Sequence, residues 1–191
     1  MTSEQRDSER RARFDALYEA NYHLILGYAL RRARESDALD VVAETFLVAW
    51  RRLGQMPDGD EARLWLYGTA RRVLANHERT ARRRARLHGR LADEASTTPI
   101  VTPDHRHGAV AAAFERLSRD DRELLGLVAW EGLDAVGIAH VVGCSRNAAR
   151  IRLHRARKRF AAALDEEGPL VKRVPSPGHV SLTPLGTEDT P

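Results

Sequence analysis

The chain has 191 residues, of which 42% are apolar, 30% charged and only 6% aromatic, so its composition favours one or two small helical domains over a sheet protein. The net charge is +4, and all 31 basic residues except Lys158 and Lys172 are arginines, so where they cluster matters more than how many there are. With one cysteine, no signal-peptide core and no apolar run near the roughly 18 residues of a membrane helix, we expect neither a disulfide framework nor secretion nor membrane insertion.

The N-terminal part of the chain predicts two helices. Residues 1–10 are polar and are expected to form a flexible N-terminus. Apolar side chains recur at helical spacing from Phe14 to Ala29, which predicts the first helix. Ser36 is a suitable N-cap for a second helix, with acidic residues in its first turn, and this helix is expected to stop at Gly54.

A loop and a third helix follow. GQMPDGD (54–60) contains two glycines and one proline, which predicts the loop. The helix runs from about Glu61 to about Leu87, and the later half of it is overwhelmingly arginine. Its inner positions are expected to be Leu66, Ala70, Val73 and Leu74.

Helical periodicity fails in residues 89–108, where prolines and small polar residues predict a flexible linker. His105 and His107 form an H-x-H pair there, a weak candidate for a metal site, and we expect neither metal nor cofactor. The helical pattern resumes over 109–166. Residues 167–191 contain five prolines and little apolar periodicity, which predicts a disordered tail.

Residues 133–160 carry the pattern of a helix-turn-helix. Asp134 is a suitable N-cap for a short helix, Gly143 can adopt the positive φ of a tight turn, and Ser145 can cap the next helix. The small side chain of Ala139 lets the two helices cross closely. Their shared core is expected to comprise Ile138, Val142, Ala149, Leu153, Ala156 and Phe160.

The second of these helices has a basic face suited to DNA, although a merely solvated face is the alternative. Seven basic and no acidic residues lie from Arg146 to Arg159. Arginine pairs with guanine and asparagine with adenine, whereas phosphate contacts position without specifying. The base-reading candidates are Arg146, Asn147, Arg150, Ile151 and His154. The candidates for backbone contact are the N-cap Ser145 with Arg152, Arg155, Arg157, Lys158 and Arg159. Cys144 in the turn is expected to be a small core residue rather than a redox sensor.

Three stretches resemble one protein family. DALDVVAETFLVAW (37–50) resembles the polymerase-binding helix of sigma factor domain two, and WLYGTARRVLANHERTARRR (65–84) resembles the adjoining helix that contacts the −10 promoter element. Residues 117–160 are similar throughout to domain four, which reads the −35 element. Their order and the short linker resemble the extracytoplasmic-function group of sigma factors, over about residues 11–165.

The resemblance implies an all-α chain with domain two in 11–88 and domain four in 109–166. It implies a cytoplasmic protein that binds core RNA polymerase and directs promoter recognition, DNA melting and transcription initiation without being an enzyme. It also implies a regulatory partner, an anti-sigma protein that covers the polymerase- and DNA-binding faces.

The resemblance also assigns roles to particular residues. The acids of the second helix, which alone would pass for a solvated face, are expected to dock on the largest polymerase subunit. The polymerase-binding candidates are Asp37, Asp40, Val41, Glu44, Leu47 and Val48. The loop is expected to capture a base flipped from the −10 element, and the arginine stripe to follow the melted strand. These −10 candidates are Gln55, Met56, Asp58, Arg71, Arg72, Asn76, Arg79, Arg82 and Arg83.

Some assignments stay open. Trp50, Trp65 and Tyr67 either stack on bases or pack in the core, and the core is favoured for both tryptophans. Gly68 and Arg72 depart from the usual basic residue and asparagine of the family, so the promoter bases that are read do not follow.

The main alternative function is a helix-turn-helix repressor or activator that acts without polymerase. Such a protein needs a ligand-binding or dimerising N-terminal domain. Residues 11–90 show no obvious dimer seam.

Overall fold

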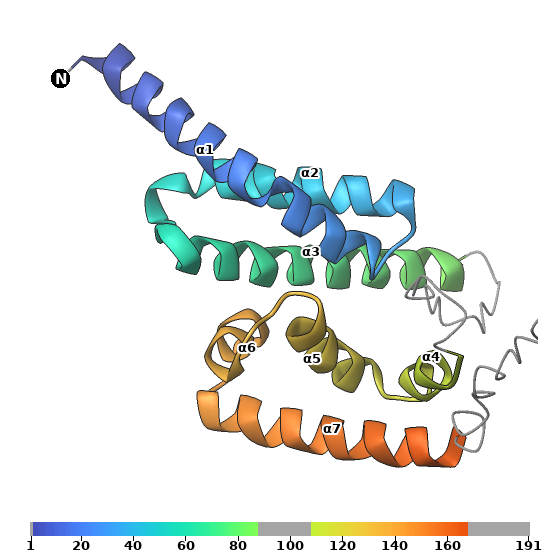
Figure 1. Ribbon diagram of the computed structural model, residues 1–191. Coiled ribbons are helices and arrows are strands. Elements are labelled where there is room, and N and C mark those ends of the chain that lie inside the picture. Colours follow the sequence, from blue (N-terminus) through green and yellow to red (C-terminus); the bar gives the residue numbers. More distant parts are fainter. Residues whose placement is uncertain (1, 88–107, 168–191) are drawn as a thin grey trace, which may run out of the picture.

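The computed structural model describes residues 2–87 and 108–167. Within these ranges the chain forms seven α-helices and one 3₁₀ turn, with no strand, and the helices lie in two layers (Figure 1). The expected all-α fold is confirmed. Most of the predicted linker and of the predicted tail lies outside the described residues, except that Gly108 begins a helix and Glu167 ends one.

The first helix, α1 (Ser3–Leu30), begins earlier than expected. The Thr2 hydroxyl accepts a hydrogen bond from the Gln5 N–H, and the Gln5 side chain accepts one from the Thr2 N–H. This reciprocal pair is a capping box, which satisfies backbone donors that a helix end otherwise leaves free. The prediction of a flexible N-terminus was therefore wrong for the helical residues 3–10.

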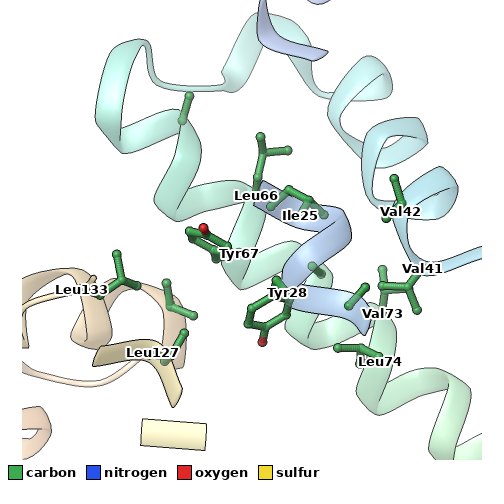
Figure 2. Close-up of a cluster of buried hydrophobic side chains, with 14 of the residues drawn as sticks. Ile25, Tyr28, Val41, Val42, Leu66, Tyr67, Val73, Leu74, Leu127 and Leu133 are labelled. Carbon is green, nitrogen blue, oxygen red and sulfur yellow. The ribbon is translucent and has the colours of Figure 1, made fainter. Parts of the chain in front are cut away.

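The first layer is completed by α2 (Glu35–Arg51), the 3₁₀ turn η1 (Leu53–Gln55) and α3 (Gly59–Leu87). The N-cap of α2 is Arg34 and no side chain caps this helix, so the assignment of Ser36 as N-cap was wrong. The inner face of α3 is confirmed, because each of its four predicted residues is buried: Leu66, Ala70, Val73 and Leu74 (Figure 2).

The second layer consists of α4 (Gly108–Glu115), α5 (Arg119–Ala129), α6 (Ala135–Val142) and α7 (Arg146–Glu167). The helix-turn-helix in α6 and α7 is confirmed in its local detail. Asp134 accepts from the N–H groups of two residues of α6, Gly143 has φ of 73°, and Ser145 accepts from the Ala148 N–H at 3.2 Å. In the core, Val141 is more deeply buried than the predicted Val142.

The two layers pack against each other, mainly through α3 and α6. A Cβ atom added at Gly68 would lie 3.5 Å from the Val141 carbonyl oxygen, so glycine allows the two helices to approach closely. Leu64 packs in the same way against Gly137. Apolar side chains from both layers form one continuous cluster, in which Leu127 and Leu133 lie close to Tyr28 and Tyr67 (Figure 2).

Charged side chains tie the end of α1 to α5 and the turn after it. Arg32 donates to Glu123 at 2.7 Å and to Glu131 at 3.0 Å, and Arg31 donates to Glu131 at 3.1 Å. The Tyr28 hydroxyl donates to Glu123 at 2.8 Å. The side chain of Glu131 is fully buried, yet within the described residues its Oε2 atom and the Nε atom of Arg31 find no hydrogen-bond partner.

The environment of this network shifts the pKa of Tyr28 and of Arg32. Burial, together with the nearby carboxylate of Glu123, raises the pKa of Tyr28 well above its ordinary value, so the hydroxyl remains a donor. Burial disfavours the charged form of Arg32, but its acidic neighbours outweigh that effect and raise its pKa. Buried ion pairs with unpartnered atoms contribute little net stability compared with apolar contacts. These ion pairs make the contact between the layers partly polar. In this it resembles the interfaces between domains that can move relative to each other.

Candidate polymerase-binding and promoter-binding surfaces

The acids of α2 form one edge of the first layer, which we call the acidic edge: Asp37, Asp40 and Glu44. The first two are exposed and Glu44 is partly exposed. Leu47, on the same side of the helix one turn after Glu44, is 46% exposed, so an apolar side chain lies beside the acids. Val48 is partly exposed.

Val41 does not belong to this surface. Its side chain is fully buried in the core of the first layer, so the prediction that it contacts a partner was wrong. The position faces inward because α2 packs on α1 and α3 along the same face as Val42 and Phe46. Val41 therefore stabilises the helix that presents the edge.

Glu44 makes a contact that the sequence did not indicate. Its Oε2 atom lies 2.9 Å from the Nε2 atom of His77 on α3, 33 residues away along the chain. This contact joins the acidic edge to the part of α3 that carries the arginine stripe. It also restricts the Glu44 side chain to one orientation.

The loop before α3 presents fewer side chains than predicted. Gln55 is exposed, but Met56 is only 6% exposed and packs in the core cluster, so its assignment to a DNA-contacting surface was wrong. Asp58 is exposed, and one of its carboxylate oxygens lies 2.7 Å from the Arg13 guanidinium of α1.

The later part of α3 carries the arginine stripe. Arg71 is partly exposed, and the other predicted members are exposed: Arg72, Asn76, Arg79, Arg82 and Arg83. Two of the arginines are oriented by neighbours one turn back, since Arg72 donates to the Thr69 hydroxyl and Arg79 to the Asn76 side chain. Both arginines remain exposed, as a phosphate-binding surface requires.

The three aromatic residues left open by the sequence are largely in the interior. Trp50 and Trp65 are partly buried and pack against the core cluster, as favoured. Trp50 also stacks edge-on with Phe14 and lies under the guanidinium of Arg10 at 4.6 Å. Tyr67 is 2% exposed, with its ring 5.3 Å from that of Tyr28. None of the three is available as a stacking platform in this arrangement.

On α7, the base-reading candidates form an outward surface that we call the −35 face. All five are exposed: Arg146, Asn147, Arg150, Ile151 and His154. The opposite side of the helix is buried through Ala149, Leu153 and Ala156. Along the flanks of the −35 face, the backbone-contact candidates are also exposed: Ser145, Arg152, Arg155, Arg157 and Lys158.

Arg159 also makes a contact within the protein that the sequence did not indicate. Its guanidinium makes two bonds, at 2.8 and 3.0 Å, to the carboxylate of Asp121 on α5. Asp121 is 4% exposed and also accepts a bond from the Ser118 hydroxyl at 2.8 Å. This paired guanidinium joins α7 to α5, and since the Arg159 side chain is 57% exposed, a phosphate contact stays a prediction.

This contact leads to a stability prediction. Asp121→Asn leaves Arg159 without its carboxylate and is expected to lower the free energy of unfolding by about 1–3 kcal/mol. Thermal unfolding followed by circular dichroism measures the loss. Asp120→Asn, at the exposed neighbouring position, is the matched control. Equal melting temperatures for the two variants would show that the pair contributes nothing.

Within 2–87 and 108–167, no three histidine, cysteine or acidic side chains gather as metal ligands, and the H-x-H pair lies outside these ranges. No helix in the same ranges is both long and apolar enough to cross a membrane. Cys144 is partly buried against the core cluster.

Comparison with known proteins gives a consistent result. Residues 17–84 match the family model "Sigma-70 region 2", and residues 107–160 match "Sigma-70, region 4". The chain is 31% identical over 160 residues to the ECF RNA polymerase sigma factor SigL of Mycobacterium tuberculosis, which covers 80% of this chain and 89% of the relative. It is 31% identical over 165 residues to the RNA polymerase sigma-H factor of Pseudomonas aeruginosa, with 79% and 86% covered.

Solved structures agree with this comparison. CnrH, in a complex with the cytosolic domain of CnrY, has a TM-score of 0.56 and 28% identity, and covers 81% of this chain and 89% of its own. The sigma factor RpoE of Bartonella quintana, bound to the anti-sigma factor NepR, has the same TM-score at 21% identity and shares the fold over 84% of this chain and 97% of its own. The region 2 match covers the part of the chain where a repressor would carry a ligand-binding or dimerising domain, so that alternative is not favoured. The chain belongs to the extracytoplasmic-function sigma factors, which bind RNA polymerase and recognise promoters.

Proposed function

We propose that this sigma factor uses three separate surfaces to start transcription. The acidic edge of α2 docks on core RNA polymerase, the loop and arginine stripe of α3 hold the melted −10 element, and the −35 face of α7 reads duplex DNA. The observation that supports this most strongly is the −35 face, where every base-reading candidate is exposed on a helix whose opposite side is buried. It acts as a non-catalytic regulator, and we place its work in the cytoplasm.

At the −10 element, the arginines of α3 neutralise the backbone of the melted strand, and the released counterions supply affinity. A base flipped out of the duplex needs a partner to offset its lost stacking. The exposed amide of Gln55 in the loop offers both a donor and an acceptor for this purpose. Asp58, three residues further along the chain, is held by Arg13.

We further propose that the two layers separate when the promoter is engaged. The −10 and −35 elements lie about 25 base pairs apart, which is about 85 Å of duplex at 3.4 Å per base pair. In the docked arrangement α6 contacts both α3 and α7, so the axes of the two reading helices are roughly 20 Å apart. Residues 88–107 can reach about 70 Å when extended. Separation would also uncover Tyr67.

A regulatory partner is proposed as well. Of the similar structures, CnrH was solved with the cytosolic domain of CnrY and RpoE of Bartonella quintana with an anti-sigma factor. We propose that an anti-sigma protein likewise binds this chain and blocks its polymerase- and DNA-binding surfaces.

The −35 face is tested by separating base reading from backbone contact. Arg150→Ala is expected to cost about 1–3 kcal/mol at the cognate promoter and to relax the preference at one base position. Arg157→Ala is expected to weaken binding to all DNA sequences about equally. It should also reduce the salt dependence of binding by roughly one released counterion. Holoenzyme binding to a library of −35 variants at several salt concentrations measures both effects.

The two variants control for each other, since each removes one exposed guanidinium from α7. A uniform loss in both would contradict the division between reading and positioning residues. No loss in either would contradict the assignment of the −35 face.

A further inference from the structure

One guanidinium from α1 holds the whole segment between α2 and α3. Arg13 donates to the Leu53 carbonyl at 2.9 Å, to the Met56 carbonyl at 3.0 Å and to the Asp58 carboxylate at 2.7 Å. These three acceptors lie 40 to 45 residues away along the chain. The planar, forked donor set of arginine suits several fixed acceptors at once, which the single ammonium of lysine does not.

The same segment is also anchored from inside. The side chains of Leu53 and Met56 are 2% and 6% exposed and pack in the core cluster. The backbone between them is a hydrogen-bonded turn, in which the Gln55 N–H donates to the Arg52 carbonyl at 2.8 Å and the Met56 N–H to the Leu53 carbonyl at 3.3 Å. Gln55 thus lies between two positions that are fixed by both side chain and carbonyl, and its own side chain is exposed.

A second arginine of α1 supports the preceding turn. Arg10 donates to the Trp50 carbonyl at 3.0 Å, and its guanidinium lies over the Trp50 ring. The last carbonyls of a helix lack partners within it, so this bond satisfies one at the end of α2. The first turns of α1 therefore connect to the chain on both sides of η1.

We propose that Arg13 is a positioning residue that fixes Gln55 for contact with the base flipped from the −10 element. The role rests on the proposed function of the loop. The Gln55 amide can pair with the exposed edge of an unstacked base only if the turn that carries it keeps one conformation. A turn fixed before binding avoids the entropy cost of ordering it on the DNA. Residues 3–13 of α1 thus contribute to promoter recognition without touching DNA.

The test uses full-length protein with core polymerase and a fork-junction promoter DNA whose −10 single strand carries an abasic site at each position in turn. For the wild-type protein, DNA that is abasic at one position is expected to bind about tenfold more weakly, because the captured base and its contacts are missing. Arg13→Ala is expected to bring this ratio of affinities close to one. Its affinity for the abasic DNA and for core polymerase should equal that of the wild type.

Three further variants sharpen the result. Gln55→Ala is expected to bring the ratio of affinities for intact and abasic DNA close to one as well. The double variant with Arg13→Ala should have the same ratio as either single variant, because both substitutions act on one contact. Asp58→Asn weakens one of the three bonds and should reduce the ratio in part, which keeps the test available if Arg13→Ala folds poorly. Arg11→Ala, at an exposed position of the same helix, is the matched control and should keep the full ratio.

Each outcome has a distinct meaning. If Arg13→Ala and Asp58→Asn keep the wild-type ratio, the positioning role is overturned. If they weaken intact and abasic DNA equally, Arg13 only stabilises the fold, and the role is likewise overturned. If the wild-type protein itself shows no abasic effect at any position, base capture by the loop is what fails.

Discussion

A disulfide between Gly68→Cys and Val141→Cys, in a Cys144→Ser background, is expected to abolish promoter-dependent transcription until a reductant is added. The two positions face each other across the contact between α3 and α6, where a Cβ atom at 68 would lie 3.7 Å from the Val141 Cα atom. Since a Cα–Cβ bond adds about 1.5 Å, the two Cα atoms are at most about 5.2 Å apart, and disulfides span Cα separations of about 4.4–6.8 Å. The bond would hold the two layers in the docked arrangement.

The expected loss of transcription is large because the docked protein cannot contact both promoter elements at once. With the reading helices roughly 20 Å apart, the docked protein cannot reach two elements separated by about 85 Å of duplex. When only one of the two promoter elements can be reached, stronger binding to that element cannot replace the missing contact with the other. Run-off transcription with core polymerase, in the oxidised and then the reduced sample, measures the effect.

The reduced sample is the internal control, since it has the same sequence and the same history. Each single cysteine variant should be active under both conditions. Circular dichroism should show equal helix content before and after reduction. Full activity of the cross-linked protein would show that transcription proceeds without separation of α3 from α6.

Local features of this fold were readable from the sequence because their causes are local. Asp134, Gly143 and Ser145 each act within three or four residues of their own position, and the structure shows all three in the predicted roles. The buried face of α3 follows in the same way from its helical spacing. The start of α1 was equally local, and the T-x-x-Q pattern at Thr2 was the signal that was overlooked.

The errors concern which side of an element faces the interior. Val41 and Met56 were assigned to surfaces from their place in a motif, whereas both pack in the core cluster. The sequence alone does not show whether an apolar side chain next to acidic or polar ones faces the interior or the solvent, because that depends on its neighbours in space. For these two residues the neighbours come from other helices of the layer.

Contacts between distant segments could not be predicted at all. The pairs Arg159–Asp121, His77–Glu44 and the bonds of Arg13 join residues 33 to 45 positions apart. In a chain with 31 basic and 27 acidic residues, composition does not indicate which partners meet. The contact of Gly68 with α6 was equally unpredictable. A glycine within a helix indicates that another backbone approaches closely there, but it does not indicate which segment does so.

Reversal of the acidic edge in Asp40→Lys with Glu44→Lys is expected to weaken binding to core polymerase by about 3 kcal/mol, or roughly a hundredfold. Asp40 is exposed and Glu44 partly exposed beside the exposed Leu47, so a basic partner surface would meet repulsion where it now meets attraction. The helix itself should persist, because α2 is held by core residues on its other face. Fluorescence titration of labelled core polymerase measures the affinity.

Two controls separate docking from other effects of the change. Asp15→Lys with Glu19→Lys alters the net charge equally at exposed positions of α1 and should retain core affinity. His77→Gln alters the contact with Glu44 while leaving the edge acidic, so it reports what that contact alone contributes. If the reversed edge binds core polymerase as tightly as the α1 control, with normal circular dichroism, then polymerase docks elsewhere. If His77→Gln reproduces the loss, the orientation of Glu44 rather than the charge of the edge determines the affinity.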